Sequence, residues 1–169
     1  AITVSITTLD RKLARKMEPR TATPQSRLEA VAKLADAKVP VSVNIAPVIP
    51  GLNDEEIPAI LKAAVQAGAT GAAYIPLRLP YSVKDLFVEW LERSYPTKKE
   101  KILDRIRTMR GGKLNDPNFG SRMSGEGVWS EQINNLFLLG CKRAGMPQRG
   151  PALSTAYFRR PGGQQLQLF

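Results

Sequence analysis

Three short segments of the chain alternate between apolar and polar positions, and each is followed by a helical pattern. Their sequences are ITVSITTL (residues 2–9), VPVSVNIAPV (39–48) and TGAAYIPLRL (70–79). A period of two is typical of β-strands, because successive side chains point to opposite faces of a sheet. Strands that alternate with helices over short connections predict a parallel sheet and an α/β fold.

Between and after these segments, apolar residues recur every three to four positions, which is the period of an amphipathic helix. One helix is expected to begin after the N-cap Thr23, with Pro24 at its first position, and Gly68 is expected to end the next. A third, VKDLFVEWLERSY, follows the third strand. The positions expected to face the core are Leu28, Val31 and Leu34, then Ile57, Ile60, Leu61 and Val65, then Leu86, Trp90 and Leu91.

The pattern after Pro96 is helical only. Thr97 and Glu100 have the spacing of a capping box for a helix that ends near Gly111, and a last helix is expected from Ser130 to Ala144. The Gly-rich segment 111–129 between them predicts a long loop. The chain is therefore divided into three strand–helix units (1–96), a helical extension (97–146) and a tail (147–169).

The net charge, the absence of His and the single Cys limit the functions that this chain can have. With 25 Lys and Arg against 15 Asp and Glu the net charge is +10, which favours phosphate-rich partners, although a basic surface alone is also common. The chain has no His and a single cysteine, Cys141, so it has no intrachain disulfide and no imidazole-based zinc or nucleophile site. No metal site is predicted. The absence of a long apolar run predicts no contact with membranes and a cytoplasmic location.

Polar residues share one parity on each expected strand, opposite the Val and Ile positions. They are Ser5 and Thr7, Ser42 and Asn44, and Tyr74 and Arg78. A parallel sheet buried on both faces is apolar almost throughout, so polar side chains on one face need partners. Either they satisfy one another and nearby backbone, or they line a ligand site near the carboxyl ends of the strands.

A conspicuous acidic turn follows the second strand, in the sequence NDEE at 53–56. Consecutive residues of one helical turn point around the helix, so they do not converge on a metal ion. Asn53 and Glu56 are expected to act as a capping pair, and the negative charges suit the helix dipole. We therefore expect a structural role for this turn.

In their order along the chain, VSITTLD, MEPR, RLEAV, VNIAPVIPGLND, AAYIPLRLP and RTMRGGKLNDPNFGSRMSGEG resemble the carboxyl-terminal half of radical S-adenosylmethionine enzymes. The resemblance is to the spore-photoproduct-lyase-like, "DNA repair photolyase" group, and it covers residues 1 to about 146. It implies that residues 1–96 are the last three units of a partial (β/α)6 barrel, so that the chain is a fragment of a longer protein.

The same resemblance implies S-adenosylmethionine and a 4Fe-4S cluster as cofactors of the parent enzyme, which would cleave the former to a 5'-deoxyadenosyl radical. The family's CxxxCxxC loop is missing from this sequence, so the fragment alone is expected to be inactive and to bind neither cofactor. Its catalytic residues stay unknown. A partner implied in this way is the amino-terminal half of its own barrel.

The resemblance also implies the residues of a half-site for S-adenosylmethionine. Ser5, Thr7, Arg20 and Asn44 would hydrogen-bond the ligand, and Val48 and Ile49 would pack on the adenine. The backbone near Tyr74, Ile75 and Pro76 would bind the adenine edge, and Arg78 and Tyr81 would contact substrate.

Two further groups of residues could contact macromolecules. Arg110, Lys113 and Arg122 flank the Gly-rich loop and are expected either to contact nucleic-acid phosphates or to be solvated charges. The last five residues, QLQLF, resemble the peptide that binds the bacterial DNA polymerase sliding clamp. Gln165, Leu166, Leu168 and Phe169 would make that contact, unless the tail packs on its own domain.

The leading hypothesis for function is a piece of a radical S-adenosylmethionine enzyme that acts on DNA or another nucleic acid. The alternative is a basic adaptor without catalytic activity, which binds DNA or the sliding clamp through its tail. Cys141, among apolar residues of the last helix, is expected to be a buried structural side chain.

Overall fold

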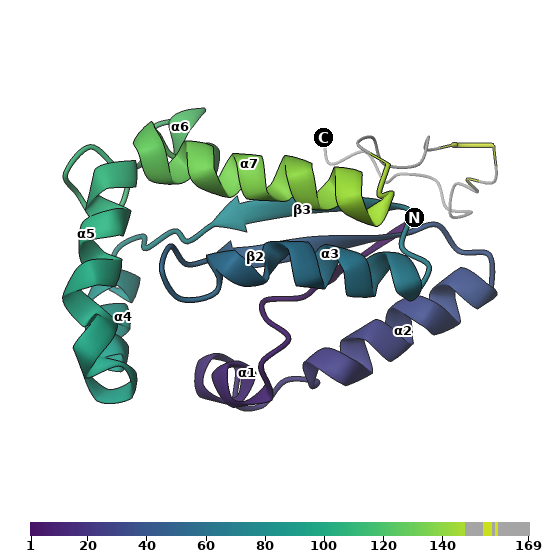
Figure 1. Cartoon of the computed structure of the whole chain (residues 1–169), viewed down its shortest axis with the longest axis horizontal. Coiled ribbons are helices and arrows are strands. Elements are labelled where there is room, and N and C mark those ends of the chain that lie inside the picture. The colour runs from purple at the N-terminus through teal and green to yellow at the C-terminus, as the bar shows by residue number, and fades with distance from the viewer. Residues whose placement is uncertain (148–153, 157, 159–169) are drawn as a thin grey trace, which may run out of the picture.

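The computed structural model describes residues 1–147, 154–156 and 158. A three-stranded parallel sheet forms its centre, in the order β1 (Ile2–Ser5), β2 (Val41–Val48) and β3 (Gly71–Pro76). Figure 1 shows the three strands running in the same direction, with helices in front of them. The predicted α/β class with parallel strand–helix units is thus confirmed for this part of the chain, and the partial barrel stays a prediction.

Seven α-helices accompany the strands in the described residues. Two short 3-10 turns, at Asp54–Glu56 and Pro96–Lys98, precede α3 and α5. The helices are α1 (Arg11–Met17), α2 (Pro24–Asp36), α3 (Ile57–Gln66), α4 (Val83–Ser94), α5 (Lys99–Met109), α6 (Ser121–Ser124) and α7 (Gly127–Ala144).

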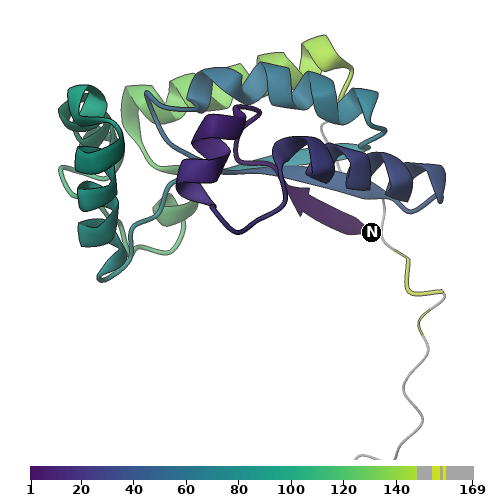
Figure 2. The same ribbon diagram turned by 90° about the horizontal axis from the view of Figure 1, so that it is seen from below.

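The helices α2, α3 and α7 cover one face of the sheet (Figures 1 and 2). Alternate residues of β2, namely Val41, Val43 and Ile45, are fully buried beneath them. The residues between, Ser42 and Asn44, point to the opposite face, where none of these three helices lies. The parity expected for β2 is therefore the observed one.

The predicted helix boundaries hold where a local cap defines them. Thr23 caps α2, because its side chain accepts a hydrogen bond from the Ser26 amide (3.2 Å), and Pro24 is the first helical residue. Gly68 follows the end of α3 with φ of +90°, and Ala35 of α2 lies 2.6 Å from where its Cβ would be. A side chain at this position would therefore clash with α2 as well as strain the backbone.

The helix that covers β3 is α7, not the helix that follows β3 in the chain. Tyr74 of β3 packs on Phe137 of α7, with ring centroids 4.8 Å apart, and its hydroxyl bonds the Asn134 side chain. The helix predicted to follow the third strand forms as α4, which lies at the carboxyl end of the sheet beside α5 (Figure 1). A second core lies there, made of Leu13, Ile49, Leu52, Leu91, Ile102, Leu103 and Ile106.

Four smaller expectations are corrected. The third strand ends at Pro76 rather than near Leu79, and α7 begins at Gly127 rather than at Ser130. The predicted loop 111–129 contains the short helix α6. The Thr97–Glu100 capping box does not form, and Lys99 at the start of α5 pairs with Glu92 of α4 instead. No helix among the described residues is long and apolar enough to cross a membrane.

Candidate functional site at the open face of the sheet

The open face of the sheet carries a row of small and polar side chains. Ser5 of β1, Asn44 of β2 and Ala73 of β3 are paired in register, and so are Thr3, Ser42 and Gly71 one level earlier. Paired residues of neighbouring strands point to the same face. The sheet therefore presents two adjacent rows, in which hydroxyl and amide groups on β1 and β2 lie next to a flat surface of Gly71 and Ala73.

Asn44 is the most informative residue of this face. Its side-chain Oδ1 is buried but accepts no hydrogen bond within the described part of the chain. A buried polar atom without a partner costs about 1–3 kcal/mol, so native structures normally supply one. The amide oxygen of Asn44 is therefore a candidate ligand contact, in the middle of the central strand.

The loops that follow β1 and β2 are tied together by one side chain, Asn53. Its Nδ2 donates to the carbonyls of Thr7 (2.8 Å) and Pro47 (3.0 Å), and its Oδ1 accepts from the Ile49 amide (2.7 Å). Only 1% of Asn53 is exposed. It makes no capping bond to the following helix, so the expected Asn53–Glu56 capping pair is wrong. Asn53 instead fixes the carboxyl end of the sheet.

The rest of the acidic turn is structural, as expected. Glu56 accepts hydrogen bonds from the Thr8 hydroxyl and the Leu9 amide, which joins the turn to the loop after β1. Asp54 accepts from the Gly51 amide (2.8 Å) and lies 3.9 Å from Arg105. No group of three or more potential metal ligands occurs in the described residues. The carboxylates of Asp54 and Glu56 therefore stabilise the loops that shape the carboxyl edge.

The arginine that bonds to β1 is Arg27, whereas no such bond is found for Arg20 among the described residues. Arg27 of α2 donates to the Ser5 carbonyl (3.0 Å) and pairs with Glu18 (2.9 Å). Arg20 is exposed in the connection between α1 and α2. Thr7 is buried, and its hydroxyl is already bonded to the Ala46 carbonyl (2.9 Å). Ser5 and Asn44 are therefore the members of the predicted half-site that the structure brings together on one face.

The residues predicted to contact adenine are dispersed. Val48 is fully buried in the helix-side core, and the side chain of Tyr74 lies against α7, so neither reaches the open face. Burial raises the pKa of Tyr74. Ile49 is fully buried at the carboxyl edge and borders a cavity there. Ile75 has the parity of Ala73 and is half-buried, while Pro76 is buried at the end of β3.

Of the residues predicted to contact nucleic acid, Arg110 is turned inward. It is 6% exposed, and its guanidinium donates to the carbonyls of Leu77 (3.0 Å), Ser121 (3.2 Å) and Arg122 (3.0 Å). Burial lowers the pKa of Arg110, and the nearby Asp116 charge opposes this effect. The guanidinium of Arg110 thus joins α5, α6 and the end of β3 and does not face solvent, which corrects its predicted role in binding phosphates.

The remaining predicted contacts differ in their exposure to solvent. Lys113 and Tyr81 are exposed, and Arg122 lies over the ring of Phe119 at 5.0 Å. Arg78 is half-buried with its Nη1 3.5 Å from the Met123 sulfur. The tail residues Gln165, Leu166, Leu168 and Phe169 lie outside the described residues.

Three important residues were missed or given another role by the sequence patterns: Arg27, Asn53 and Arg110. Each binds backbone carbonyls of distant segments, and nothing in the local sequence marks such contacts. The nearest available signal was polarity at positions that flank apolar runs, which for Asn53 suggested a helix cap.

Comparison with known proteins is consistent with this geometry. Residues 1–64 match the family model described as "Radical SAM superfamily". The "Uncharacterized protein Rv2578c" and "Uncharacterized protein MT2655" of Mycobacterium tuberculosis and the "Uncharacterized protein Mb2609c" of Mycobacterium bovis are each 33% identical over 122 residues. The alignments cover 70% of this chain and 35% of each relative, so the chain spans about a third of their length. No solved structure matches. The first two strand–helix units, which carry Ser5 and Asn44, are thus the part of this chain that is similar to radical S-adenosylmethionine domains.

Proposed function

We propose that this chain is the carboxyl-terminal part of a radical S-adenosylmethionine enzyme and that its open sheet face binds S-adenosylmethionine. The observation that supports this most directly is the unpartnered Asn44 oxygen beside Ser5, within the segment that matches the family model. Both groups suit the amino, carboxylate and ribose groups of the ligand, which offer donors and acceptors of their own.

In this proposal, Asn44 and Ser5 hold the ligand from the sheet, and the Asn53 network keeps the carboxyl edge rigid around it. Arg20, exposed in the α1–α2 connection, would have to turn toward β1 to reach the carboxylate. With a reduced 4Fe-4S cluster, S-adenosylmethionine held by Asn44 and Ser5 would supply the chemistry for radical hydrogen abstraction from a substrate. The cluster's cysteines must come from the rest of the protein, because this chain has only the buried Cys141.

The test uses the complete protein, purified without oxygen and reconstituted with iron and sulfide. Formation of 5'-deoxyadenosine from S-adenosylmethionine in the presence of a reductant is the expected result. Asn44→Ala is expected to weaken S-adenosylmethionine binding about tenfold in calorimetry, since one buried hydrogen bond is lost. Asn135→Ala, at an exposed position of α7, is the control. No iron uptake and no 5'-deoxyadenosine would refute the proposal.

We further propose that the substrate of this enzyme is a nucleic acid, as the net charge of +10 favours. A second candidate function, a non-catalytic adaptor, rests on the sequence QLQLF at 165–169. It requires that the chain binds a bacterial sliding clamp and that Leu168→Ala with Phe169→Ala abolishes this binding. Equal binding by the double variant would exclude the adaptor function.

A further inference from the structure

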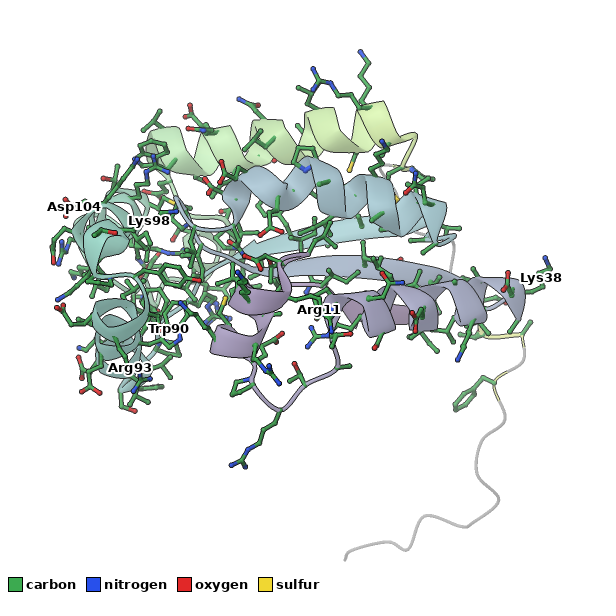
Figure 3. The ribbon with its side chains drawn as sticks, turned by 60° about the horizontal axis from the view of Figure 1, so that its bottom comes forward. Arg11, Lys38, Trp90, Arg93, Lys98 and Asp104 are labelled. Carbon is green, nitrogen blue, oxygen red and sulfur yellow. The ribbon has the colours of Figure 1, made fainter. Side chains whose placement is uncertain are left out.

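Two cavities flank α1 at the carboxyl end of the sheet, and they differ in character. One, of about 430 Å³, lies between α1, α4 and the ends of β2 and β3. The other, of about 350 Å³, lies between α1 and the beginning of α2. Figure 3 shows Trp90 on α4 and Arg11 at the start of α1, near α2.

The larger cavity is mainly apolar and contains two aromatic rings. Phe87 and Trp90 are stacked with centroids 5.7 Å apart and planes at 24°, and Trp90 is fixed because its indole nitrogen donates to the Lys16 carbonyl (3.0 Å). Leu86, on the same side of α4, is 62% exposed although it borders this cavity. The lining is completed by Met17, Ile49, Leu77 and Val83, with Glu89 and Arg93 as its charged members.

The smaller cavity is basic. Arg11, Lys12 and Arg15 of α1 line it, and none of them forms an ion pair in the part of the chain that the structure describes. The carboxylate that lines it, Glu18, is already paired with Arg27 at 2.9 Å. The electrostatic potential in this cavity is therefore positive. It attracts a chain of several phosphate groups more strongly than it attracts a single phosphate group.

We propose that α1 is the recognition element for an unpaired nucleotide of a single-stranded nucleic acid. The base enters the apolar cavity beside Phe87 and Trp90, and the adjacent phosphodiester groups lie along Arg11, Lys12 and Arg15. Aromatic walls bind every base through its π-face, and cations bind the backbone whatever the sequence, so the site selects strandedness rather than sequence. The bound strand would be the substrate of the proposed enzyme. Only this last statement rests on the proposed function, because binding of the strand does not require it.

Binding is measured by fluorescence anisotropy with the complete protein and a fluorescein-labelled single-stranded DNA oligonucleotide, without S-adenosylmethionine. An abasic oligonucleotide of equal length and charge serves as the second probe. The unmodified protein is expected to bind the abasic strand about tenfold more weakly, because the stacking of the base is lost. Leu86→Glu is expected to remove this difference, whereas Leu138→Glu, at an exposed position of α7, leaves it unchanged.

The basic cavity is tested by a pair of double variants that change the net charge equally. Arg11→Ala with Arg15→Ala is expected to weaken binding of both strands about tenfold and to reduce the dependence on salt by about two phosphate contacts. Lys142→Ala with Arg143→Ala, at exposed positions near the end of α7, is expected to change binding less than about twofold, an expectation that rests on the electrostatic attraction being local to the cavity.

Two results would overturn the inference: equal binding of the normal and the abasic strand by the unmodified protein, or equal weakening by the two double variants. Formation of 5'-deoxyadenosine is measured in the same preparations. Its persistence without strand binding rejects this inference alone, whereas strand binding without 5'-deoxyadenosine rejects the radical chemistry alone.

Discussion

Asn53 is the single side chain on which the shape of the carboxyl edge most depends. Replacement by Ala removes the three hydrogen bonds to Thr7, Pro47 and Ile49, and leaves buried backbone groups without partners. We expect Asn53→Ala to lower the free energy of unfolding by about 2–4 kcal/mol in urea denaturation. The exposed Asn135→Ala is expected to change it by less than about 0.5 kcal/mol. Similar values for both variants would contradict this role.

Cys141 offers a second test at this scale, because this residue of α7 is only 2% exposed and belongs to the core. Burial raises its pKa, so at a given pH the folded protein holds less of the reactive thiolate than the unfolded chain does. In native buffer at pH 8, we expect Ellman's reagent to label Cys141 at least about a hundredfold more slowly than in denaturant. Labelling should accelerate with urea below the unfolding midpoint. Equal rates in both states would show that the thiol is accessible.

How far the sequence predicts single residues depends on the range of the contacts that define them. Thr23 and Gly68 were predicted correctly, because a helix cap or stop depends on backbone groups a few residues away. Asn53 and Arg110 were assigned other roles, because their partners come from segments up to 46 residues apart in the chain. The parity of Asn44 was predictable, but the absence of a partner for its oxygen is a property of the folded sheet alone.

At the scale of elements, Gly140 allows α7 to lie close against α3. A Cβ at this position would be 2.8 Å from Leu61 Cδ1 and 3.2 Å from Pro58 Cα. At an exposed helical site, Gly→Ala usually stabilises by about 0.5–1 kcal/mol. For Gly140→Ala we expect the opposite sign, a loss of about 1–2 kcal/mol in thermal or urea unfolding, because the added methyl forces the helices apart. A stabilised Gly140→Ala variant would contradict the close packing of these helices.

Arg110 connects elements rather than binding a partner, and this role can be tested by proteolysis. We expect Arg110→Ala to open the segment 111–126 to trypsin, since its bonds to Leu77, Ser121 and Arg122 are lost. Cleavage should be at least about fivefold faster than in the unmodified protein. Lys113→Ala, which removes an exposed charge in the same segment, is the control and should not accelerate it. Equal cleavage of the two variants would exclude this connecting role of Arg110.

The order of strands and helices up to β3 was predictable, because it depends on local periodicity. The place of α4 was not, although its amphipathic pattern was recognised. An apolar face shows that a helix packs on something, and both the sheet and the second core around Leu91 and Ile102 satisfy that requirement. The choice was decided by α7, whose Phe137 occupies the space over Tyr74.

At the scale of the whole molecule, the sheet has an unpaired edge in the described residues, along β1. The amides of Ile2 and Ile6 donate to the Pro40 and Asn44 carbonyls, both at 2.9 Å. Since donors alternate along a parallel strand, the amides of Thr3 and Ser5 point away from β2. Such an edge pairs readily with a further strand. The curated relatives, about three times as long as the aligned region, have room for such a strand.

We therefore expect a further strand of the complete protein to pair with β1, and amide hydrogen exchange followed by NMR tests this. In the isolated chain, the amides of Thr3 and Ser5 should exchange rapidly, because they point away from β2 toward the unpaired edge. In the complete protein we expect their exchange to slow at least about a hundredfold, as in a paired strand. The Ile6 amide, bonded to Asn44 in this chain, is the internal control and should be protected in both. Unchanged exchange at Thr3 and Ser5 would mean that β1 stays an edge strand, and the sheet would then not continue into a barrel on this side.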